Sequence, residues 1–283
     1  MKRHSVTGNK AEVIASKGSL IIVGGREDKQ KDRVILREIA RRTGTGKLIV
    51  ATLASEVSGD LWKDYRDVFT DLGVKHIEHL HFENHEEARH PKYKAMFHNA
   101  KTVFFTGGDQ LKITTKIGGT DIVDWIQDIY LNGGTIAGTS AGASVMGKIM
   151  LMGGENQESH KVGQWMMSPG LGLLPDMIID QHFAQRGRIG RLLGAVAPNP
   201  GLIGVGIDED TAIIVEKNHL RVIGTNAVYI VDARNVTYTN LSEAAAENTM
   251  AMHNVQLHIL AEDHVFDLKT HRPRLDQVER VHG

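Results

Sequence analysis

The 283-residue chain contains no cysteine. That absence excludes disulfide bonds, thiolate nucleophiles and cysteine-ligated zinc sites, and it is consistent with a reducing compartment. The chain also lacks an excess of either charge, with 33 Lys and Arg against 34 Asp and Glu and a formal net charge of −1. No global field therefore attracts nucleic acid or a membrane surface. A charged partner would have to be bound by a local cluster.

Long apolar segments are absent as well. No run of about 18 apolar residues predicts a membrane span. Residues 1–19, MKRHSVTGNKAEVIASKGS, lack the apolar centre of a signal peptide. No G-x-x-x-x-G-K-[ST] phosphate-binding loop occurs. We therefore expect a cytoplasmic protein that binds neither membrane nor nucleic acid.

Short apolar segments alternate with helical patterns through the first half of the chain. LIIVGG (20–25) is an apolar run closed by glycines, as in a buried strand, and DRVILREIARRTG (32–44) spaces its apolar residues as a helix does. Further strands are expected at 47–55, 74–82, 102–108 and 134–138, and further helices at 61–73, 90–100 and 120–134. This alternation predicts a parallel sheet with helices on both faces.

The second half changes pattern. Residues 203–233 indicate several strands joined by short turns, hence antiparallel pairing, and VQLHIL (255–260) and HVFDL (264–268) suggest a further pair. The predicted fold class is α/β, with a mainly parallel sheet flanked by helices and antiparallel strands in the C-terminal part. We expect one domain at 19–270, between a flexible lead-in at 1–18 and a polar tail at 271–283.

The segment GTSAG (138–142) matches G-x-S-x-G at the end of an expected strand. A serine on a strand-to-helix turn needs small neighbours, and the N–H groups at the start of the following helix can stabilise developing negative charge. Ser140 is therefore a candidate nucleophile. The alternative is that these small residues only allow a strand and a helix to pack closely.

A nucleophilic serine needs a base and an acid that orients the base. His182 ends the apolar run MIIDQHF (177–183), and Asp208, Glu209 and Asp210 follow a strand in GVGIDEDTA (204–212). The favoured order along the chain is therefore serine, histidine, acid.

A second arrangement of the triad follows the serine, acid, histidine order of α/β-hydrolases. It would pair Asp208 or Asp210 with His253 or His258. Those histidines lie in an ordinary strand region, which makes this arrangement less persuasive.

Three arginines follow His182 within AQRGRIGRLLGAV (184–196), namely Arg186, Arg188 and Arg191. Guanidinium groups grip carboxylates with paired hydrogen bonds, so the cluster suits a carboxylate-bearing substrate. The alternative is a solvated basic start of a helix. His79 and His81 share a strand face, but a metal site needs a third ligand, so no metal is expected.

The chain resembles the cyanophycinases, within the wider group of peptidase E-like serine peptidases. The residues that carry the resemblance are GGDQ (107–110), GTSAGAS (138–144), DQHFAQRGRIGRL (180–192) and GIDEDTA (206–212). The resemblance implies that Ser140 is the nucleophile, His182 the base and Glu209 the orienting acid. It implies backbone N–H groups of Gly108 and Ala141 as the oxyanion hole. It further implies a substrate pocket lined by Gln110, Asp180, Gln181, Arg186, Arg188 and Arg191.

The family cleaves cyanophycin, a poly-aspartate chain with arginine on each side-chain carboxyl, into β-Asp-Arg dipeptides. The resemblance implies the same exopeptidase activity here, without a cofactor, in a homodimer. Two alternatives stand beside it. One is a dipeptidase of the peptidase E kind that acts on short α-linked aspartyl peptides, and the other is a non-catalytic binder of an acidic polymer.

Overall fold

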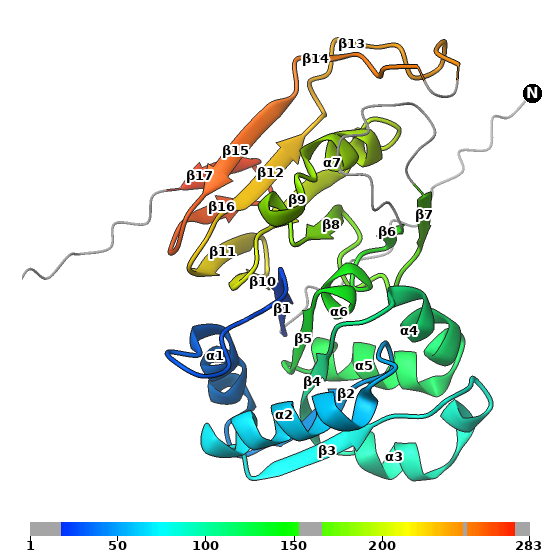
Figure 1. The fold of residues 1–283 in the computed structure, drawn as a ribbon, viewed down its shortest axis with the longest axis vertical. Helices are drawn as coiled ribbons and strands as arrows, with labels where there is room; N and C mark the ends of the chain where they lie inside the picture. Colours follow the sequence, from blue (N-terminus) through cyan, green and yellow to red (C-terminus); the bar gives the residue numbers. More distant parts are fainter. Residues whose placement is uncertain (1–17, 153–165, 246–247, 275–283) are drawn as a thin grey trace, which may run out of the picture.

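The computed structural model describes residues 18–152, 166–245 and 248–274. They form a nine-stranded sheet and a four-stranded sheet, with helices packed against both, as Figure 1 shows. The predicted α/β class is therefore confirmed, with parallel strands in the N-terminal half and antiparallel strands toward the C-terminus. The division into two sheets was not predicted.

The parallel part of the large sheet holds five strands. In spatial order these are β1 (Ser19–Val23), β5 (Thr135–Thr139), β4 (Ala100–Phe105), β2 (Lys47–Ala51) and β3 (His76–Leu80). β1, β5 and β2 are apolar and mostly buried, whereas β3 is a partly exposed edge strand. All five overlap the segments assigned to strands from the sequence, and the ends of β1, β4 and β5 differ from those segments by one to three residues.

Four antiparallel strands extend the large sheet beyond β1. In spatial order they are β10 (Thr211–Glu216), β11 (His219–Gly224), β16 (Val265–Asp267) and β17 (Arg272–Arg274). β10 pairs with β1 so that Ala212 lies opposite Val23. The start of β10 thus lies beside the end of β1.

The helices cover the two faces of the large sheet because its strands are apolar on both sides. Alternate residues of β1 face opposite ways: Ile21 and Val23 pack in the cluster of helices α1 and α2, whereas Leu20 and Ile22 pack with the other helices. The first face carries α1 (Val34–Thr43) and α2 (Ser58–Asp71). The second carries α3 (Lys92–Phe97), α4 (Gln110–Ile117), α5 (Asp121–Leu131) and α6 (Ala141–Ser144).

The small sheet has the order β15 (Gln256–Leu260), β12 (Val228–Asp232), β9 (Ile203–Ile207) and β8 (Met177–Gln181). Only β8 and β9 run parallel, and helix α7 (Ile189–Val196) connects them. Gly204 of β9 lets α7 approach, because a Cβ there would lie 2.8 Å from the Val196 side chain.

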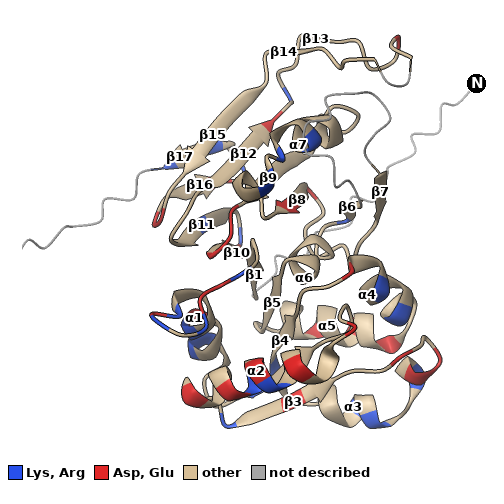
Figure 2. Ribbon diagram, viewed as in Figure 1, with Lys and Arg blue, Asp and Glu red and all other residues tan. Residues whose placement is uncertain are grey.

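Shorter elements complete the described chain. They are the pair β6 (Ile149–Met152) and β7 (Met166–Pro169), the pair β13 (Tyr238–Thr239) and β14 (Met252–His253), and the 3₁₀ turns η1 (Glu87–Arg89) and η2 (Ala184–Arg186). The ribbon in Figure 2 shows acidic and basic residues interspersed along the chain, with acidic residues along α2 and in nearby loops. That distribution matches the near-zero net charge.

The expected chain ends fall mainly outside the described residues. Of the lead-in at 1–18 only Gly18 is described, and of the tail at 271–283 only residues 271–274. Those four residues include β17, so the start of the expected tail is an edge strand. Across the three described ranges, no helix has the length and apolarity that crossing a membrane requires.

Candidate active site

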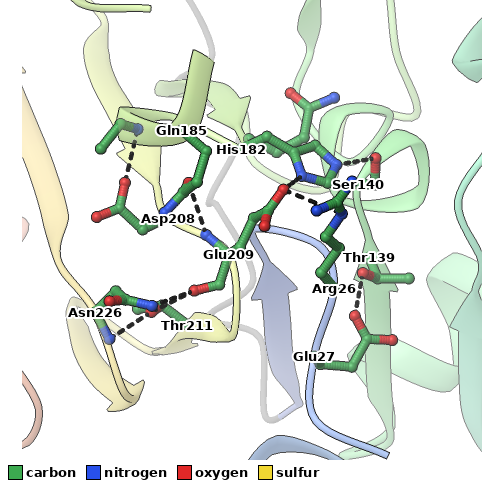
Figure 3. Close-up of polar contacts among 12 residues, drawn as sticks. Arg26, Glu27, Thr139, Ser140, His182, Gln185, Asp208, Glu209, Thr211 and Asn226 are labelled. Atoms are coloured by element: carbon green, nitrogen blue, oxygen red, sulfur yellow. Dashed lines mark hydrogen bonds and ion pairs between the residues drawn. The ribbon is translucent and has the colours of Figure 1, made fainter. Parts of the chain in front are cut away.

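Three strand ends bring Ser140, His182 and Glu209 together, as Figure 3 shows. Ser140 follows β5, whereas His182 follows β8 and Glu209 follows β9. Ser140 Oγ lies 2.9 Å from His182 Nε2, and His182 Nδ1 lies 2.8 Å from Glu209 Oε1. An ionised carboxylate only accepts hydrogen bonds, so Nδ1 carries the proton and Nε2 accepts from the serine hydroxyl. This hydrogen-bonded order fits a serine that is to be deprotonated by the imidazole.

The turn at Ser140 has a backbone conformation that non-glycine residues rarely adopt, with φ 54° and ψ −112°. Gly138 and Gly142 make the turn possible. A Cβ on Gly138 would lie 2.3 Å from the Gly142 carbonyl oxygen, and one on Gly142 would lie 2.3 Å from the carbonyl oxygen of Phe105. The Ser140 N–H donates to the carbonyl of Val23 at 3.1 Å. Both glycines of the motif are therefore needed for packing, and Ser140 itself is partly buried.

His182 is buried, and its backbone also has a positive φ of 51°. Burial lowers the pKa of its imidazole below the ordinary value of 6.5, and the nearby charges of Arg186 and Arg188 lower it further. The hydrogen bond with Glu209 acts in the opposite direction. The net shift keeps the imidazole neutral at neutral pH, as a general base requires.

Of the three neighbouring acids, only Glu209 has its carboxylate against His182. The Asp208 carboxylate accepts from the backbone N–H of Ala184 at 2.8 Å and from that of Ala227 at 3.3 Å. Asp210 accepts from the N–H of Asp28 at 2.8 Å. These two aspartates hold loops in place.

The histidines of the second triad arrangement lie against other partners. His253 packs its ring against Tyr238 at a centroid separation of 4.9 Å, and His258 packs against Phe266 at 5.6 Å. The hydrogen bonds therefore assemble the serine, histidine, acid order rather than the hydrolase order.

The glycine pair after β1 supports His182. The carbonyl of Gly24 accepts from the His182 N–H at 2.8 Å, and the carbonyl of Gly25 accepts from the Asp210 N–H at 2.9 Å. A Cβ on Gly25 would lie only 2.2 Å from His182 Cε1. The imidazole thus lies directly against the Gly25 backbone, so the glycine pair allows this backbone to approach the His182 ring closely.

Glu27 was not recognised in the sequence, although it lies two residues after that glycine pair. Its side chain is buried, and its carboxylate accepts from Tyr65 at 2.5 Å and from Thr139 at 2.6 Å. Burial and the neighbouring carboxylate raise the pKa of Tyr65, so its hydroxyl keeps the proton that it donates. Since Thr139 precedes Ser140, Glu27 fixes the strand end that carries the serine. An acid two residues after a glycine-closed strand was the available signal.

The predicted oxyanion donors lie on either side of Ser140. Ala141 is the first residue of α6, and the loop with Gly107 and Gly108 faces the serine, since a Cβ on Gly107 would lie 3.5 Å from Ser140 Cβ. Gly108 has a φ of 139° and passes so close to Ala54 that a Cβ would lie 2.2 Å from its carbonyl oxygen. Only glycine fits there, which brings that backbone near the serine.

The arginine block divides into buried and exposed members. Arg191 Nε and Nη2 donate to the two oxygens of Asp180 at 3.0 and 2.8 Å, and Arg188 Nη1 donates to Asp180 Oδ1 at 2.9 Å. Burial lowers the pKa of Arg188 to about 10, which leaves it charged at neutral pH. Arg186 is exposed. Asp180 has 0% exposure, and its carboxylate is paired with these two arginines.

The two glutamines of the predicted pocket also form hydrogen bonds within the protein. Gln110 donates to the carbonyl of Leu151 at 2.8 Å, and the buried Gln181 accepts from Arg188 through its backbone carbonyl at 2.5 Å. Gln185, which the sequence did not single out, accepts from the Glu209 N–H at 3.1 Å. The Gln185 contact connects the segment after β8 to the loop that carries Glu209.

His79 and His81 form a different kind of cluster. His79 Nε2 lies 2.8 Å and His81 Nδ1 lies 3.2 Å from Thr52 Oγ1, both within hydrogen-bonding distance. The His79 ring stacks on Trp62. Burial lowers the pKa of His79 to about 4. In the part of the chain that the structure describes, no three acidic or histidine side chains are arranged to hold a metal ion.

Comparison with known proteins adds to this geometry. The model of peptidase family S51 matches residues 20–223. The chain is 36% identical over 267 residues to a cyanophycinase of Geminocystis herdmanii (strain PCC 6308), covering 93% of this chain and 98% of that protein. It is 37% identical over 271 residues to a cyanophycinase of Nostoc sp. (strain PCC 7120), covering 94% and 91%.

Among solved structures, a peptidase from an acI-B1 Actinobacterium matches with a TM-score of 0.62 and 23% identity, over 77% of this chain and 92% of that one. At this level of identity the likeness concerns the fold. The sequence relatives confirm the predicted resemblance to the cyanophycinases.

Proposed function

This chain belongs to peptidase family S51, and from that premise we propose that it is a serine exopeptidase that hydrolyses cyanophycin to β-Asp-Arg dipeptides. The observation that carries the proposal is the unbroken hydrogen-bonded order from Ser140 through His182 to Glu209. It lies in a chain that matches cyanophycinases over more than nine-tenths of its length.

In the proposed reaction, Ser140 Oγ attacks the carbonyl carbon of the scissile bond while His182 Nε2 takes the hydroxyl proton. Glu209 stabilises the imidazolium through Nδ1–H, and the N–H groups of Gly108 and Ala141 bind the oxyanion. His182 then protonates the leaving amine as the acyl-enzyme forms. A water molecule, deprotonated by His182, releases the acyl group and restores the serine.

We propose that the arginine block contributes to the substrate pocket in two ways, by direct contact and by positioning the chain. Arg186 is exposed and can contact a carboxylate directly. Arg188 and Arg191 are held by Asp180, which fixes the segment between His182 and α7. In this proposal Asp180 acts on the pocket by positioning the two arginines.

The two alternatives have less support. A dipeptidase of the peptidase E kind needs no array of cations for a small α-linked peptide, whereas each β-Asp-Arg unit carries a carboxylate. A non-catalytic binder would not need a neutral histidine between a serine and a carboxylate. Reaction with a serine-directed inhibitor separates an enzyme from a binder.

We further propose a cytoplasmic homodimer that needs no cofactor. Support for self-association comes from β15, an edge strand of the small sheet within the described chain, on which Leu257 is 51% and Ile259 60% exposed. Apolar side chains on a free strand edge favour pairing with another chain. Sedimentation of the protein and of an Ile259→Lys variant tests this: a dimer that the variant converts to monomer supports it.

Mass spectrometry of products tests the activity. Purified protein is incubated with cyanophycin and, separately, with α-linked Asp-X dipeptides. Release of β-Asp-Arg from the polymer supports the proposal. Cleavage of the dipeptides alone assigns the protein to the peptidase E kind, and cleavage of neither substrate contradicts both proposals.

A further inference from the structure

Of the three arginines proposed from the sequence for carboxylate binding, two already pair with a carboxylate inside the protein. Arg188 and Arg191 are buried and both donate to Asp180. Their charge still contributes to the local field, but their guanidinium groups are engaged inside the protein. An exposed guanidinium beside the triad is therefore the better candidate for direct contact with a substrate carboxylate, and Arg186 is one such group.

Arg26 is a second exposed guanidinium at the same edge, and it lies outside the arginine block. Its side chain is 77% exposed, and its Nε lies 3.4 Å from Glu209 Oε1, the oxygen that also accepts from His182. Figure 3 shows the Arg26 side chain reaching the Glu209 end of the hydrogen-bonded series. A cation is thus present directly beside the reacting groups.

The backbone at Arg26 is fixed on both sides while its side chain is left free to move. The carbonyl of Gly25 accepts from the Asp210 N–H, and the N–H of Asp28 donates to the Asp210 carboxylate at 2.8 Å. Between these anchors Arg26 has a φ of 47°. A positive φ at a non-glycine residue is uncommon, and here it is held by the two anchors to Asp210.

The contact between Arg26 and Glu209 is weak enough to be exchanged. The Arg26 side chain is 77% exposed and that of Glu209 is 19% exposed, so water solvates the guanidinium, and its long side chain loses freedom on pairing. At 3.4 Å the pair is also longer than a good charge-assisted hydrogen bond. A substrate carboxylate that offers two oxygens would be a better partner for this guanidinium.

We propose that Arg26 is a specificity residue that binds the free α-carboxylate of a β-linked arginine in the substrate. The inference rests on the proposed function, because a β-Asp-Arg unit attaches arginine through its amino group and leaves that carboxylate free. Arg26 then leaves Glu209 as substrate binds and returns when the product departs.

Two synthetic β-Asp-Arg oligomers of equal length test the proposal. One keeps the arginine α-carboxylates, and in the other they are carboxamides, so that the guanidinium groups are the same. Steady-state kinetics are measured for the natural protein, Arg26→Gln and Arg26→Lys. Arg37→Gln is the matched control, because Arg37 is exposed on α1 and donates to the Asp32 carbonyl, away from the site.

Arg26→Gln is expected to lower kcat/KM for the carboxylate oligomer about 10-fold, mostly through KM, and to change the carboxamide oligomer less than about 2-fold. Arg26→Lys recovers part of the loss, and Arg37→Gln matches the natural protein. Equal losses on both oligomers, with a shifted pH profile, would mean that Arg26 acts through Glu209 and would overturn the proposal.

The same series separates this inference from the proposed function. Unchanged kinetics in Arg26→Gln, with both oligomers still cleaved, would overturn the role of Arg26 and leave the function intact. Failure of the natural protein to cleave the carboxylate oligomer would instead overturn the proposed function, and with it the substrate on which the inference rests. Affinities measured in Ser140→Ala report the contribution of Arg26 without turnover.

Discussion

The two sheets contribute different parts of the candidate site by different physical means. The nine-stranded sheet supplies Ser140 at the end of β5, where glycine crowding fixes the turn. The four-stranded sheet supplies His182 and Glu209 after β8 and β9, where hydrogen bonds to neighbouring loops fix the side chains. The serine turn is therefore determined locally, whereas its alignment with the histidine depends on contacts between the sheets.

The end of β1 supplies those contacts. Successive carbonyls of Val23 and Gly24 accept from the N–H groups of Ser140 and His182, one on each side of the boundary between the sheets. Glu27 then holds Thr139 on the large-sheet side. This short loop sets the distance between the proposed nucleophile and the proposed base, so substitutions in it should affect turnover more than folding.

Ser140→Ala tests the large-sheet side and should have the largest effect. It removes the proposed nucleophile without adding bulk, so turnover of cyanophycin should fall roughly 10⁴-fold or more. Binding of uncleaved oligomer, measured by calorimetry, should persist. Turnover equal to that of the natural protein would exclude Ser140 as the nucleophile.

Gly25→Ala tests the contact between the β1 loop and the small sheet. The added methyl group would collide with the His182 ring, and the φ of 103° disfavours alanine. We expect kcat/KM to fall roughly 100-fold, since small misplacements of reacting groups are costly. Gly59→Ala on α2 is the control, because a Cβ there has open space. Near-normal turnover in Gly25→Ala would show that the imidazole position tolerates displacement.

Glu27→Gln tests how firmly the serine strand must be held. A neutral amide cannot accept from both Tyr65 and Thr139 as the carboxylate does, so we expect kcat to fall about 10-fold with KM little changed. Tyr65→Phe removes one donor and leaves the bond to Thr139, so its effect on kcat should be smaller. A loss of thermal stability in both variants with unchanged kcat would assign this network to folding alone.

The pH dependence of kcat/KM should show the smallest effect of these tests, and it checks the sign of one electrostatic interaction. Because burial lowers the pKa of His182, its basic form should persist below pH 6.5, and the rate should decline only under more acidic conditions. Arg186→Gln removes a positive charge that lowers this pKa, so the acidic limb of the profile should move toward higher pH. A downward shift would contradict the sign of that interaction.

Sequence patterning predicted much of this molecule because its signals are local. An apolar run closed by glycine marked β1, apolar runs marked β2, β4 and β5, and helical spacing marked α1, α2 and α5. The G-x-S-x-G pattern marked Ser140, and a polar segment after an apolar run marked His182. These features depend on neighbours within a few residues, which the chain displays directly.

The remaining features depend on contacts between distant segments. Nothing near residue 208 indicates that β9 and β10 belong to different sheets, or that the loop between them faces β1. The pairing of Asp180 with Arg188 and Arg191 follows from burial, and a sequence shows charge without showing burial. Glu27 and Arg26 acquire their partners only when β1 lies beside β5 and β10.

Labelling with a serine-directed fluorophosphonate, followed by peptide mapping, tests whether the two sheets together build the site. We expect one label per chain, on the peptide that contains Ser140, and loss of labelling in His182→Ala, because the serine depends on a base from the other sheet. Labelling at another residue, or equal labelling of Ser140 without His182, would contradict the central claim that the two sheets together build the site.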